Sequence, residues 1–196
     1  MSTNLFDTLA DAADILSGLG KDWALVGGLA VSTYVEPRFT RDIDIAVAVN
    51  NDTEAEQFAH SWTASGFVIH SVIEQDITNR LATIRSHRPG AEHEIVIDLL
   101  FASSGIEPEV AAEARHLEIA PDITVPVARP GHLFALKLLS ADPKTRPQDF
   151  IDLNHLAEYL DAEERHAAVQ AVRLIEERGF NRGRDLEPLL EERLGE

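Results

Sequence analysis

The protein has 196 residues, enough for one domain with a buried core, and its 34 acidic residues outnumber 17 Lys and Arg residues, giving a formal net charge of -17. This charge disfavours a nucleic-acid partner unless a local basic strip overrides it, and the lack of cysteine excludes disulfides and thiolate metal sites. No apolar run is long enough to span a membrane and the acidic start does not resemble a signal peptide, so we expect a soluble cytoplasmic protein with no membrane partner.

The first 49 residues alternate between helical and strand patterns. Apolar residues recur at helical spacing from Leu5 to Leu16 and predict an opening helix. A short apolar run at 23–26 predicts a strand, which ends at the glycine pair Gly27-Gly28 and is followed by a helix-like stretch at 29–36. Residues 42–49, DIDIAVAV, alternate with the period of a second strand.

The middle of the chain favours more strands than helices. Its residues predict two helices, a further strand, a hairpin and one or two short edge strands. β-branched residues favour the strands, the turn-like sequence RPGAEH favours the hairpin, and prolines limit the length of the edge strands. In chain order these are a helix at 53–65, a strand at 67–73, a hairpin of 80–87 and 94–102 around the turn 88–93, a helix at 106–116 and edge strands within 116–128.

The last third is helical throughout. Three amphipathic stretches, at 130–141, 146–160 and 161–179, follow one another, and Asp161 with Glu164 has the spacing of a capping box. The expected fold class is therefore α/β (α+β). We expect a mixed-sheet core at residues 1–128 and a C-terminal helical lobe at residues 129–196 that closes one side of a cleft.

Asp42 and Asp44 lie two residues apart on a predicted strand. Side chains at this spacing project from the same face, so the two carboxylates point to one side while Ile43 and Ile45 point to the other. Two carboxylates about 5 Å apart, at an effective dielectric near 20, repel each other by roughly 3 kcal/mol. A hard divalent cation, Mg²⁺ above all, would relieve that repulsion and leave coordination positions open.

Asp98 and the glycine pair complete this candidate site. An acid among Ile97, Leu99 and other apolar residues is costly in a strand unless it is paired or bound to a metal. Gly27 and Gly28 lack Cβ atoms, so their backbone N–H groups can approach a phosphate closely. The sequence thus predicts a phosphate cradle that faces a metal site.

The order of these motifs resembles the DNA polymerase β-like nucleotidyltransferase superfamily, from about residue 20 to residue 160. Its signature is a glycine pair, thirteen intervening residues, Asp-Ile-Asp and an acid on a later strand. The finer pattern resembles the AbiEii/MenT branch of nucleotidyltransferase toxins. It comprises Arg38, Thr40, Asp42 and Asp44, followed by Lys137, Arg146, Asp149 and Asp152.

This resemblance implies a mixed-sheet nucleotidyltransferase core and gives the residues their roles. Asp42, Asp44 and Asp98 would hold one or two Mg²⁺ or Mn²⁺ ions that clamp an NTP, and the glycine turn would hold its phosphates, with Arg38 and Thr40 in the nucleotide-binding pattern. Lys137, a cation in an otherwise apolar helix, is the candidate phosphate contact. Asp149 and Asp152 share a helix face, and either could be the acid near the active site.

The predicted reaction moves a nucleoside monophosphate from an NTP to an acceptor that the sequence does not identify. Positive residues are scattered, the densest sets being Arg80, Arg85 and Arg88 and then Lys137, Lys144 and Arg146, so a small molecule or protein hydroxyl is favoured over tRNA. A small-molecule enzyme of the antibiotic-modifying kind and a toxin acting on tRNA, with a partner antitoxin, are the enzymatic alternatives. A catalytically inactive nucleotide-binding or partner module is a third.

Each motif also has a structural interpretation. An Asp-x-Asp pattern alone is more often an exposed strand edge, and Lys137 could be a surface lysine with a buried stem. The set of Arg146, Asp149 and Asp152 could be ion pairs on a helix surface. The combination of the glycine pair with all three acids favours the catalytic interpretation.

Overall fold

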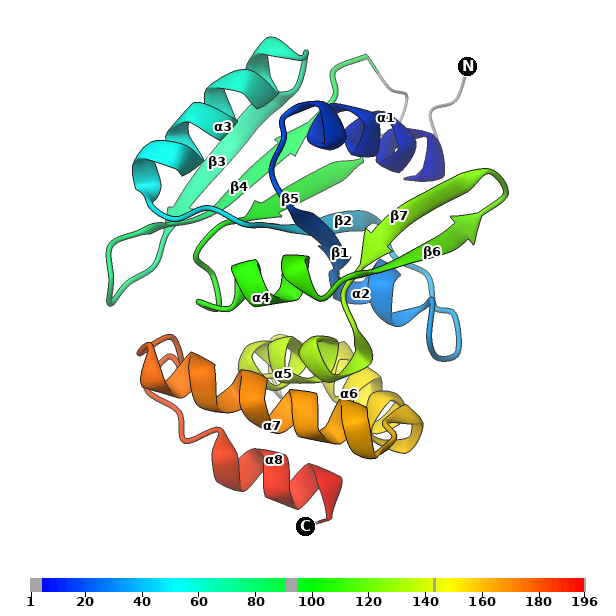
Figure 1. The fold of residues 1–196 in the computed structure, drawn as a ribbon, viewed down its shortest axis with the longest axis vertical. Helices are drawn as coiled ribbons and strands as arrows, with labels where there is room; N and C mark the ends of the chain where they lie inside the picture. Colours follow the sequence, from blue (N-terminus) through cyan, green and yellow to red (C-terminus); the bar gives the residue numbers. More distant parts are fainter. Residues whose placement is uncertain (1–4, 91–94, 143, 196) are drawn as a thin grey trace.

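The protein folds around one mixed seven-stranded sheet in the order β3-β4-β5-β2-β1-β7-β6 (Figure 1). The computed structural model describes residues 5–90, 95–142 and 144–195. The strands are β1 (Trp23–Val26), β2 (Asp42–Val47), β3 (Val68–Glu74), β4 (Leu81–His87), β5 (Val96–Leu100), β6 (Arg115–Ala120) and β7 (Ile123–Val127). The helices are α1 (Leu5–Gly18), α2 (Gly27–Val31), α3 (Asp52–Ala64), α4 (Glu107–Ala112), α5 (Pro130–Ser140), α6 (Pro147–Tyr159), α7 (Ala162–Glu177) and α8 (Glu187–Leu194).

The centre of the sheet joins strands that are distant in the sequence. Strand β2 pairs with β5 in parallel and with β1 in antiparallel fashion, and β1 pairs with β7 in parallel. The predicted hairpin is confirmed, because β4 and β5 pair antiparallel. These pairings confirm the expected α/β fold with a mixed sheet.

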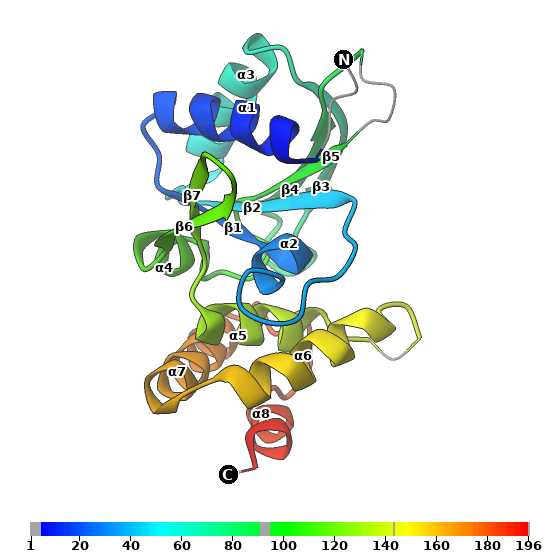
Figure 2. The same ribbon diagram turned by 90° about the vertical axis from the view of Figure 1, so that its right-hand side faces the viewer.

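Helices cover the two faces of the sheet differently. Helices α1 and α3 lie on one face, whereas α2, α4 and the stack from α5 to α8 lie on the other, as both views show (Figures 1 and 2). In the central strands the apolar positions Ile43, Ile45, Ile97 and Leu99 are fully buried. By the period of two, the acids between them point to the opposite face, which is the face toward the helical stack.

Hydrogen bonds at the start of α7 join this helix to α5, the helix that follows the last strand. Asp161 caps α7, since its carboxylate accepts a hydrogen bond from the Glu164 backbone N–H at 2.9 Å, as the capping pattern predicted. The Glu164 carboxylate in turn accepts from the backbone N–H of Gly131 at 2.8 Å and joins α7 to the start of α5. Strand β7 ends at Val127 and α5 begins at Pro130, on either side of the expected boundary; the division into 1–128 and 129–196 stays a prediction.

Some element boundaries differ from the sequence predictions. The helix expected at 29–36 is the shorter α2, which starts at the glycines themselves and ends at Val31. The helix expected at 106–116 ends at Ala112, and β6 begins at Arg115, because the chain must return to the sheet. Helix α8 was not predicted, and residues 91–94 of the predicted hairpin turn and strand lie outside the described residues. In the described part of the chain, no helix is long and apolar enough to cross a membrane.

Candidate active site

Four side-chain positions form a row across the middle of the sheet. Asp44 on β2 is paired with Asp98 on β5, and Asp98 is paired with Arg85 on β4, while Val26 on β1 is the other neighbour of Asp44. Residues paired across adjacent strands point to the same face, so the two acids lie side by side. Strand pairing thus joins acids that are more than fifty residues apart in the sequence.

Asp98 is held by Arg85. The guanidinium donates two hydrogen bonds to its carboxylate, from Nε at 2.8 Å and from Nη2 at 2.6 Å. Asp98 is only 7% exposed. The acid that was expected to need a partner among apolar residues therefore has one, and hydrogen bonding to Asp98 raises the pKa of Arg85 further above its usual value.

Asp44 has no such partner among the described residues. Burial, and next the negative charge of Asp98, raise the pKa of the Asp44 carboxyl to about 6. Lys137 and Arg146 lower it by smaller amounts. The Asp44 carboxyl thus lies buried beside a second acid, where its charged form is disfavoured.

The glycine turn packs directly against Asp44. Gly27 has a φ of +68°, in the left-handed region, and a Cβ atom at this position would overlap the Asp44 carboxylate. A Cβ atom on Gly28 would lie 2.5 Å from the nearest guanidinium nitrogen of Arg38. Close approach and backbone conformation therefore favour glycine at position 27, and Gly28 leaves room for the Arg38 guanidinium.

Lys137 lies between two buried acids. Its Nζ is 2.7 Å from Asp149 Oδ1 and 2.9 Å from Asp152 Oδ2. Ser140 donates a further hydrogen bond to Asp149 Oδ2 at 2.9 Å, and Arg146 Nη1 lies 3.9 Å from the same oxygen. These acids belong to a buried network and do not form a helix-surface ion-pair group.

Arg38 joins the loop after α2 to the same network. Its guanidinium donates two hydrogen bonds of 2.9 Å to the carboxylate of Asp152. Thr40, two residues on, donates to the backbone carbonyl of Asp42 at 3.3 Å, at the start of β2. The pattern of Arg38, Thr40 and Asp152 thus positions the loop before the Asp-x-Asp strand.

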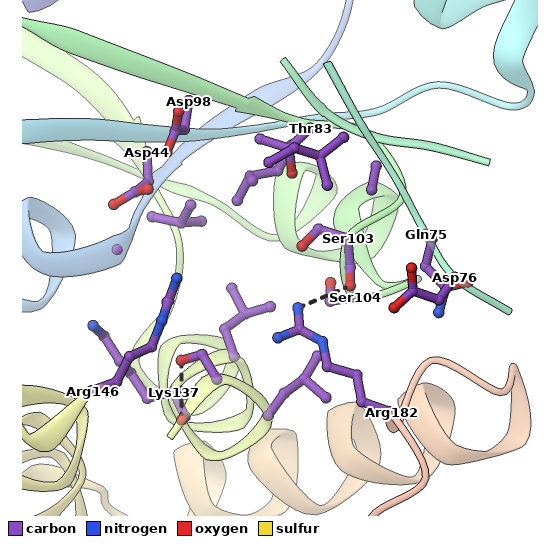
Figure 3. A pocket seen from close by; sticks show the side chains of 18 of the residues that line it. Asp44, Gln75, Asp76, Thr83, Asp98, Ser103, Ser104, Lys137, Arg146 and Arg182 are labelled. Atoms are coloured by element: carbon purple, nitrogen blue, oxygen red, sulfur yellow. Dashed lines mark hydrogen bonds between the residues drawn. The ribbon is translucent and has the colours of Figure 1, made fainter. Parts of the chain in front are cut away.

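A cavity of about 740 Å³ lies between the sheet and the helical stack. Asp44 and Asp98 lie on its sheet side, and Lys137 and Arg146 lie across from them on the helical side (Figure 3). Gly27 also lines it, whereas Asp149 and Asp152 face Lys137 and do not line the wall. The volume is within the range of about 300–1,000 Å³ typical of ligand sites.

Comparison with known proteins identifies a family for this chain. The family model described as the nucleotidyl transferase AbiEii toxin of a type IV toxin–antitoxin system matches residues 9–196. The chain belongs to the AbiEii family. This membership identifies it as a nucleotidyl transferase and implies an NTP substrate and a cognate antitoxin.

This AbiEii protein shares its fold with the solved structure of an antibiotic-resistance factor. The antibiotic-resistance factor ANT(2'')-Ia aligns at a TM-score of 0.55 and 13% identity, over 91% of this chain and 94% of that chain. JHP933 from Helicobacter pylori aligns at a TM-score of 0.45 and 15% identity, over 96% and 88% of the two chains. No curated protein matches the chain.

The acids of this AbiEii protein have the donor chemistry for a divalent cation, but only two of the three, Asp44 and Asp98, line the cavity. Carboxylate oxygens suit Mg²⁺ and Mn²⁺, and a bound cation would offset the cost of burying a charged Asp44 beside Asp98. Asp42 is exposed at the start of β2, opposite Val96, and does not line the cavity. Within the residues described, no three acidic, histidine or cysteine side chains lie close enough together to hold a metal ion.

Several residues of the AbiEii cavity were not predicted as part of the site. Arg85 was considered only as one of the scattered positive residues around the hairpin, and its pairing with Asp98 depends on the strand register, which the sequence does not show. Gln75, Thr83, Ser103 and Arg182 line the cavity from segments with no recognisable motif. Among these segments, only Asn181-Arg182-Gly183 has a recognisable sequence feature, and its Asn and Gly indicate a turn, not a binding residue.

Proposed function

We propose that the protein transfers NMP from an NTP, bound with Mg²⁺ or Mn²⁺, to a hydroxyl or phosphate acceptor and releases pyrophosphate. The observation that carries the proposal is the in-register pair of Asp44 and Asp98, which faces Lys137 and Arg146 across one cavity. An acidic wall opposite a basic wall suits a triphosphate bound together with a divalent cation. In this proposal Asp42, Asp44 and Asp98 are the residues that would hold the metal.

The side chains contribute mainly by position and charge. A bound divalent cation would neutralise triphosphate charge and activate the acceptor oxygen as a Lewis acid. Gly27 lets the backbone at the start of α2 pack closely against Asp44, and Arg146 offers positive charge from the opposite wall. Phosphoryl transfer requires little covalent work from the protein, so orienting the NTP in the cavity accounts for much of the expected acceleration.

In this proposal Lys137 contacts a phosphate of the NTP while it stays ion-paired with two acids of the protein. As it lies 2.7 Å from Asp149 and 2.9 Å from Asp152, part of its charge is already used inside the protein. Its ammonium group has three donors and lines the cavity, so one donor can contact a phosphate while Asp149 and Asp152 hold the group in place. Asp149 then acts on the substrate only through Lys137.

We propose a small molecule or protein hydroxyl as the acceptor, in preference to tRNA. The three arginines around the β4–β5 hairpin are each ion-paired: Arg80 with Asp52 at 3.2 Å, Arg85 with Asp98 and Arg88 with Asp11. Paired arginines on a chain of net charge -17 do not supply the continuous cationic track that a polynucleotide needs. The antitoxin that the family implies would be a separate protein partner, and the cytoplasmic location remains a prediction.

The proposal is tested by binding and by transfer. We expect calorimetry to detect NTP binding with Mg²⁺ and at least about tenfold weaker binding with excess EDTA. Radiolabelled NTPs, incubated with Mg²⁺ and either total tRNA or a cell extract of metabolites and proteins, should label a component of the extract. Asp44→Asn and Asp98→Asn should each lower the transfer at least about a hundredfold.

The matched control is Asp14→Asn, since Asp14 is exposed on α1 and does not line the cavity. It should transfer label at the wild-type rate. Equal NTP affinity with Mg²⁺ and with EDTA would refute the metal-dependent mechanism. Label entering tRNA, and lost with Asp44→Asn, would contradict the proposed acceptor and favour the tRNA-modifying alternative; binding without transfer to any acceptor would favour the inactive module.

A further inference from the structure

The cavity extends well beyond the acidic pair. Its far end is lined by Gln75 and Asp76 after β3, by Thr83 on β4, by Ser103 after β5 and by Arg182 between α7 and α8 (Figure 3). These segments lie on both sides of the cavity. No part of the nucleotidyltransferase signature includes these residues.

Gln75 presents only hydrogen-bond donors to this space. Its Oε1 accepts three hydrogen bonds within its own turn, from the backbone N–H of Ile77 at 2.8 Å, from that of Thr78 at 2.6 Å and from the Thr78 hydroxyl at 3.0 Å. The turn therefore fixes the side chain, and its amide NH₂ group has no partner among the described residues. Gln75 is only 9% exposed and lines the cavity, so this unpaired donor is open to a ligand there.

Thr83 is a second buried side chain without a partner. It is 8% exposed, its hydroxyl makes no hydrogen bond to the described residues, and it lies on the cavity wall. Its position follows from the register, because Thr83 is paired with Leu100 and lies two residues from Arg85 on the same face. Two residues of strand span about 6.6 Å, so Thr83 lies one side-chain row beyond the row of Arg85, Asp98 and Asp44.

Arg182 enters from the helical side. Its backbone φ of +55°, beside Gly183 at +69°, forms a sharp bend between α7 and α8. The guanidinium makes one long hydrogen bond, of 3.5 Å, to the carbonyl of Ser103 and no ion pair with described residues. Most of its five N–H donors are thus available to a ligand in the cavity.

From these groups we infer that the far end of the cavity binds the nucleobase of the NTP and selects bases that present a carbonyl oxygen, namely uracil, cytosine and guanine, over adenine. The inference rests on the proposed function, which places the triphosphate at the Asp44 end. Gln75, Thr83 and Arg182 all offer donors, which complement carbonyl oxygens. Asp76 offers the acceptor that a ring N–H or amino group beside such a carbonyl requires.

Adenine fits this lining poorly. Its hydrogen-bonding edge has an amino donor and ring nitrogens but no carbonyl oxygen. A glutamine can pair with adenine through its carbonyl and amide together, but the Gln75 Oε1 is already occupied by three donors. Each ring nitrogen of adenine accepts one hydrogen bond, whereas a carbonyl oxygen accepts two, so an ATP base would satisfy fewer of the donors of Gln75, Thr83 and Arg182, which lowers affinity.

The experiment measures the dissociation constants of the four NTPs by calorimetry with Mg²⁺ and no acceptor. We expect wild type to bind UTP, CTP and GTP at least about tenfold more tightly than ATP, the ratio expected from one lost hydrogen bond of about 1.4 kcal/mol. Thr83→Val keeps the shape of the side chain and removes the hydroxyl, and Arg182→Met removes the guanidinium. Each should weaken the binding of carbonyl-bearing NTPs several-fold and leave that of ATP almost unchanged.

Matched controls are Thr124→Val on the exposed part of β7 and Arg173→Met on α7, neither of which lines the cavity. Both should keep the wild-type order of affinities. A third variant, Gln75→Glu, retains the oxygen that the turn requires and removes the amide donor; it should weaken binding of the carbonyl-bearing NTPs in the same way.

Three outcomes would overturn the inference. Equal affinity of wild type for all four NTPs, or a preference for ATP, would show that the lining does not select for a carbonyl. NTP affinities unchanged by Thr83→Val and Arg182→Met, with a raised KM for the acceptor, would make the far end an acceptor site. If wild type binds none of the NTPs, the proposed function itself fails, and this subsite with it.

Discussion

Arg85 and Asp98 occupy paired positions on β4 and β5, and the guanidinium holds the carboxylate by two hydrogen bonds of 2.8 and 2.6 Å. Asp98 is also the neighbour of Asp44 in the parallel pairing of β5 with β2. In the proposed metal site, Asp98 is therefore neutralised by an arginine and its neighbour Asp44 is not. A metal ion at Asp98 would compete with Arg85 for the same oxygens.

Removing Arg85 should make the protein depend on a cation. Arg85→Met leaves the mostly buried Asp98 charged and unpaired, so we expect a loss of about 1–3 kcal/mol of unfolding free energy in EDTA. Added Mg²⁺ should raise the melting temperature of this variant more than that of wild type, because binding to the folded state stabilises it. Thermal unfolding with EDTA and with Mg²⁺ measures both effects.

The control is Arg88→Met, which removes an ion pair with Asp11 whose two side chains are both substantially exposed. It should cost less than about 1 kcal/mol and respond to Mg²⁺ as wild type does. An Arg85→Met variant with the wild-type response to Mg²⁺ would show that Asp98 does not take part in cation binding.

Gly27→Ala should impair both folding and transfer. The new Cβ atom would overlap the Asp44 carboxylate at a position that already has a left-handed φ. Gly20→Ala is the matched control, since its φ is +65° and no atom lies within 4 Å of the added Cβ. Gly20→Ala should cost about 1–2 kcal/mol, which is the backbone term, and Gly27→Ala about 2 kcal/mol more from the clash.

Chemical denaturation of the two variants separates these contributions, and a transfer assay completes the test. Transfer should fall about a hundredfold with Gly27→Ala, because Asp44 is displaced, and should be unaffected by Gly20→Ala. Similar stability losses in both variants would indicate that Asp44 moves aside without cost.

The titration of Asp44 should be visible in metal-free protein. Its pKa is about 6 in the folded state against 3.8 for the ordinary carboxyl, so between these values the folded protein holds a proton that the unfolded chain has lost. The contribution of this group to stability is therefore complete at low pH and is lost as the pH rises from about 4 to about 6. Denaturant midpoints in EDTA across this range should fall less for Asp44→Asn than for wild type.

Other carboxyl groups also titrate in this pH range, so a control variant is needed. Asp14→Asn, an exposed substitution on α1, should retain the wild-type dependence on pH. Parallel curves for wild type and Asp44→Asn would mean that the Asp44 pKa is not raised.

Asp152→Asn should loosen the loop before β2. The substitution weakens the hold on both Arg38 and Lys137 in a buried network, and we expect a loss of about 3 kcal/mol. Trypsin should then cleave faster in the loop, at Arg38 or Arg41. Glu158→Gln, an exposed change on the same helix, should stay within about 0.5 kcal/mol of wild type. Unchanged proteolysis in Asp152→Asn would show that Arg38 does not anchor this loop.

The sequence predicts best where a pattern is local. The Asp-x-Asp strand, the glycine pair and the Asp161 cap each depend on spacing within a few residues, and all three occur as such in the structure. The family pattern extends this to distant segments, and the match over residues 9–196 confirms it. The roles of the individual site residues remain predictions.

The elements that were mispredicted lack a decisive local signal. Residues 106–116 have helical composition throughout, yet the chain changes to strand at Arg115, because β6 pairs with β7 at the sheet edge. Helix α8 is short and carries four acids or bases among eight residues, so its apolar face is narrow. It is buried through Leu190 and Leu194 only because the other helices of the stack provide a surface for them.

The sequence by itself determined which chemical groups are proposed for the site: three acids, a glycine pair and a lysine in an apolar helix. Only the tertiary structure decided what each group contacts. It placed Asp98 between Asp44 and Arg85, enclosed Lys137 between Asp149 and Asp152, and brought Gln75, Thr83 and Arg182 to one end of the cavity. The physical reason is that side-chain type and spacing are local properties, whereas strand register and helix packing result from the burial of the whole apolar core.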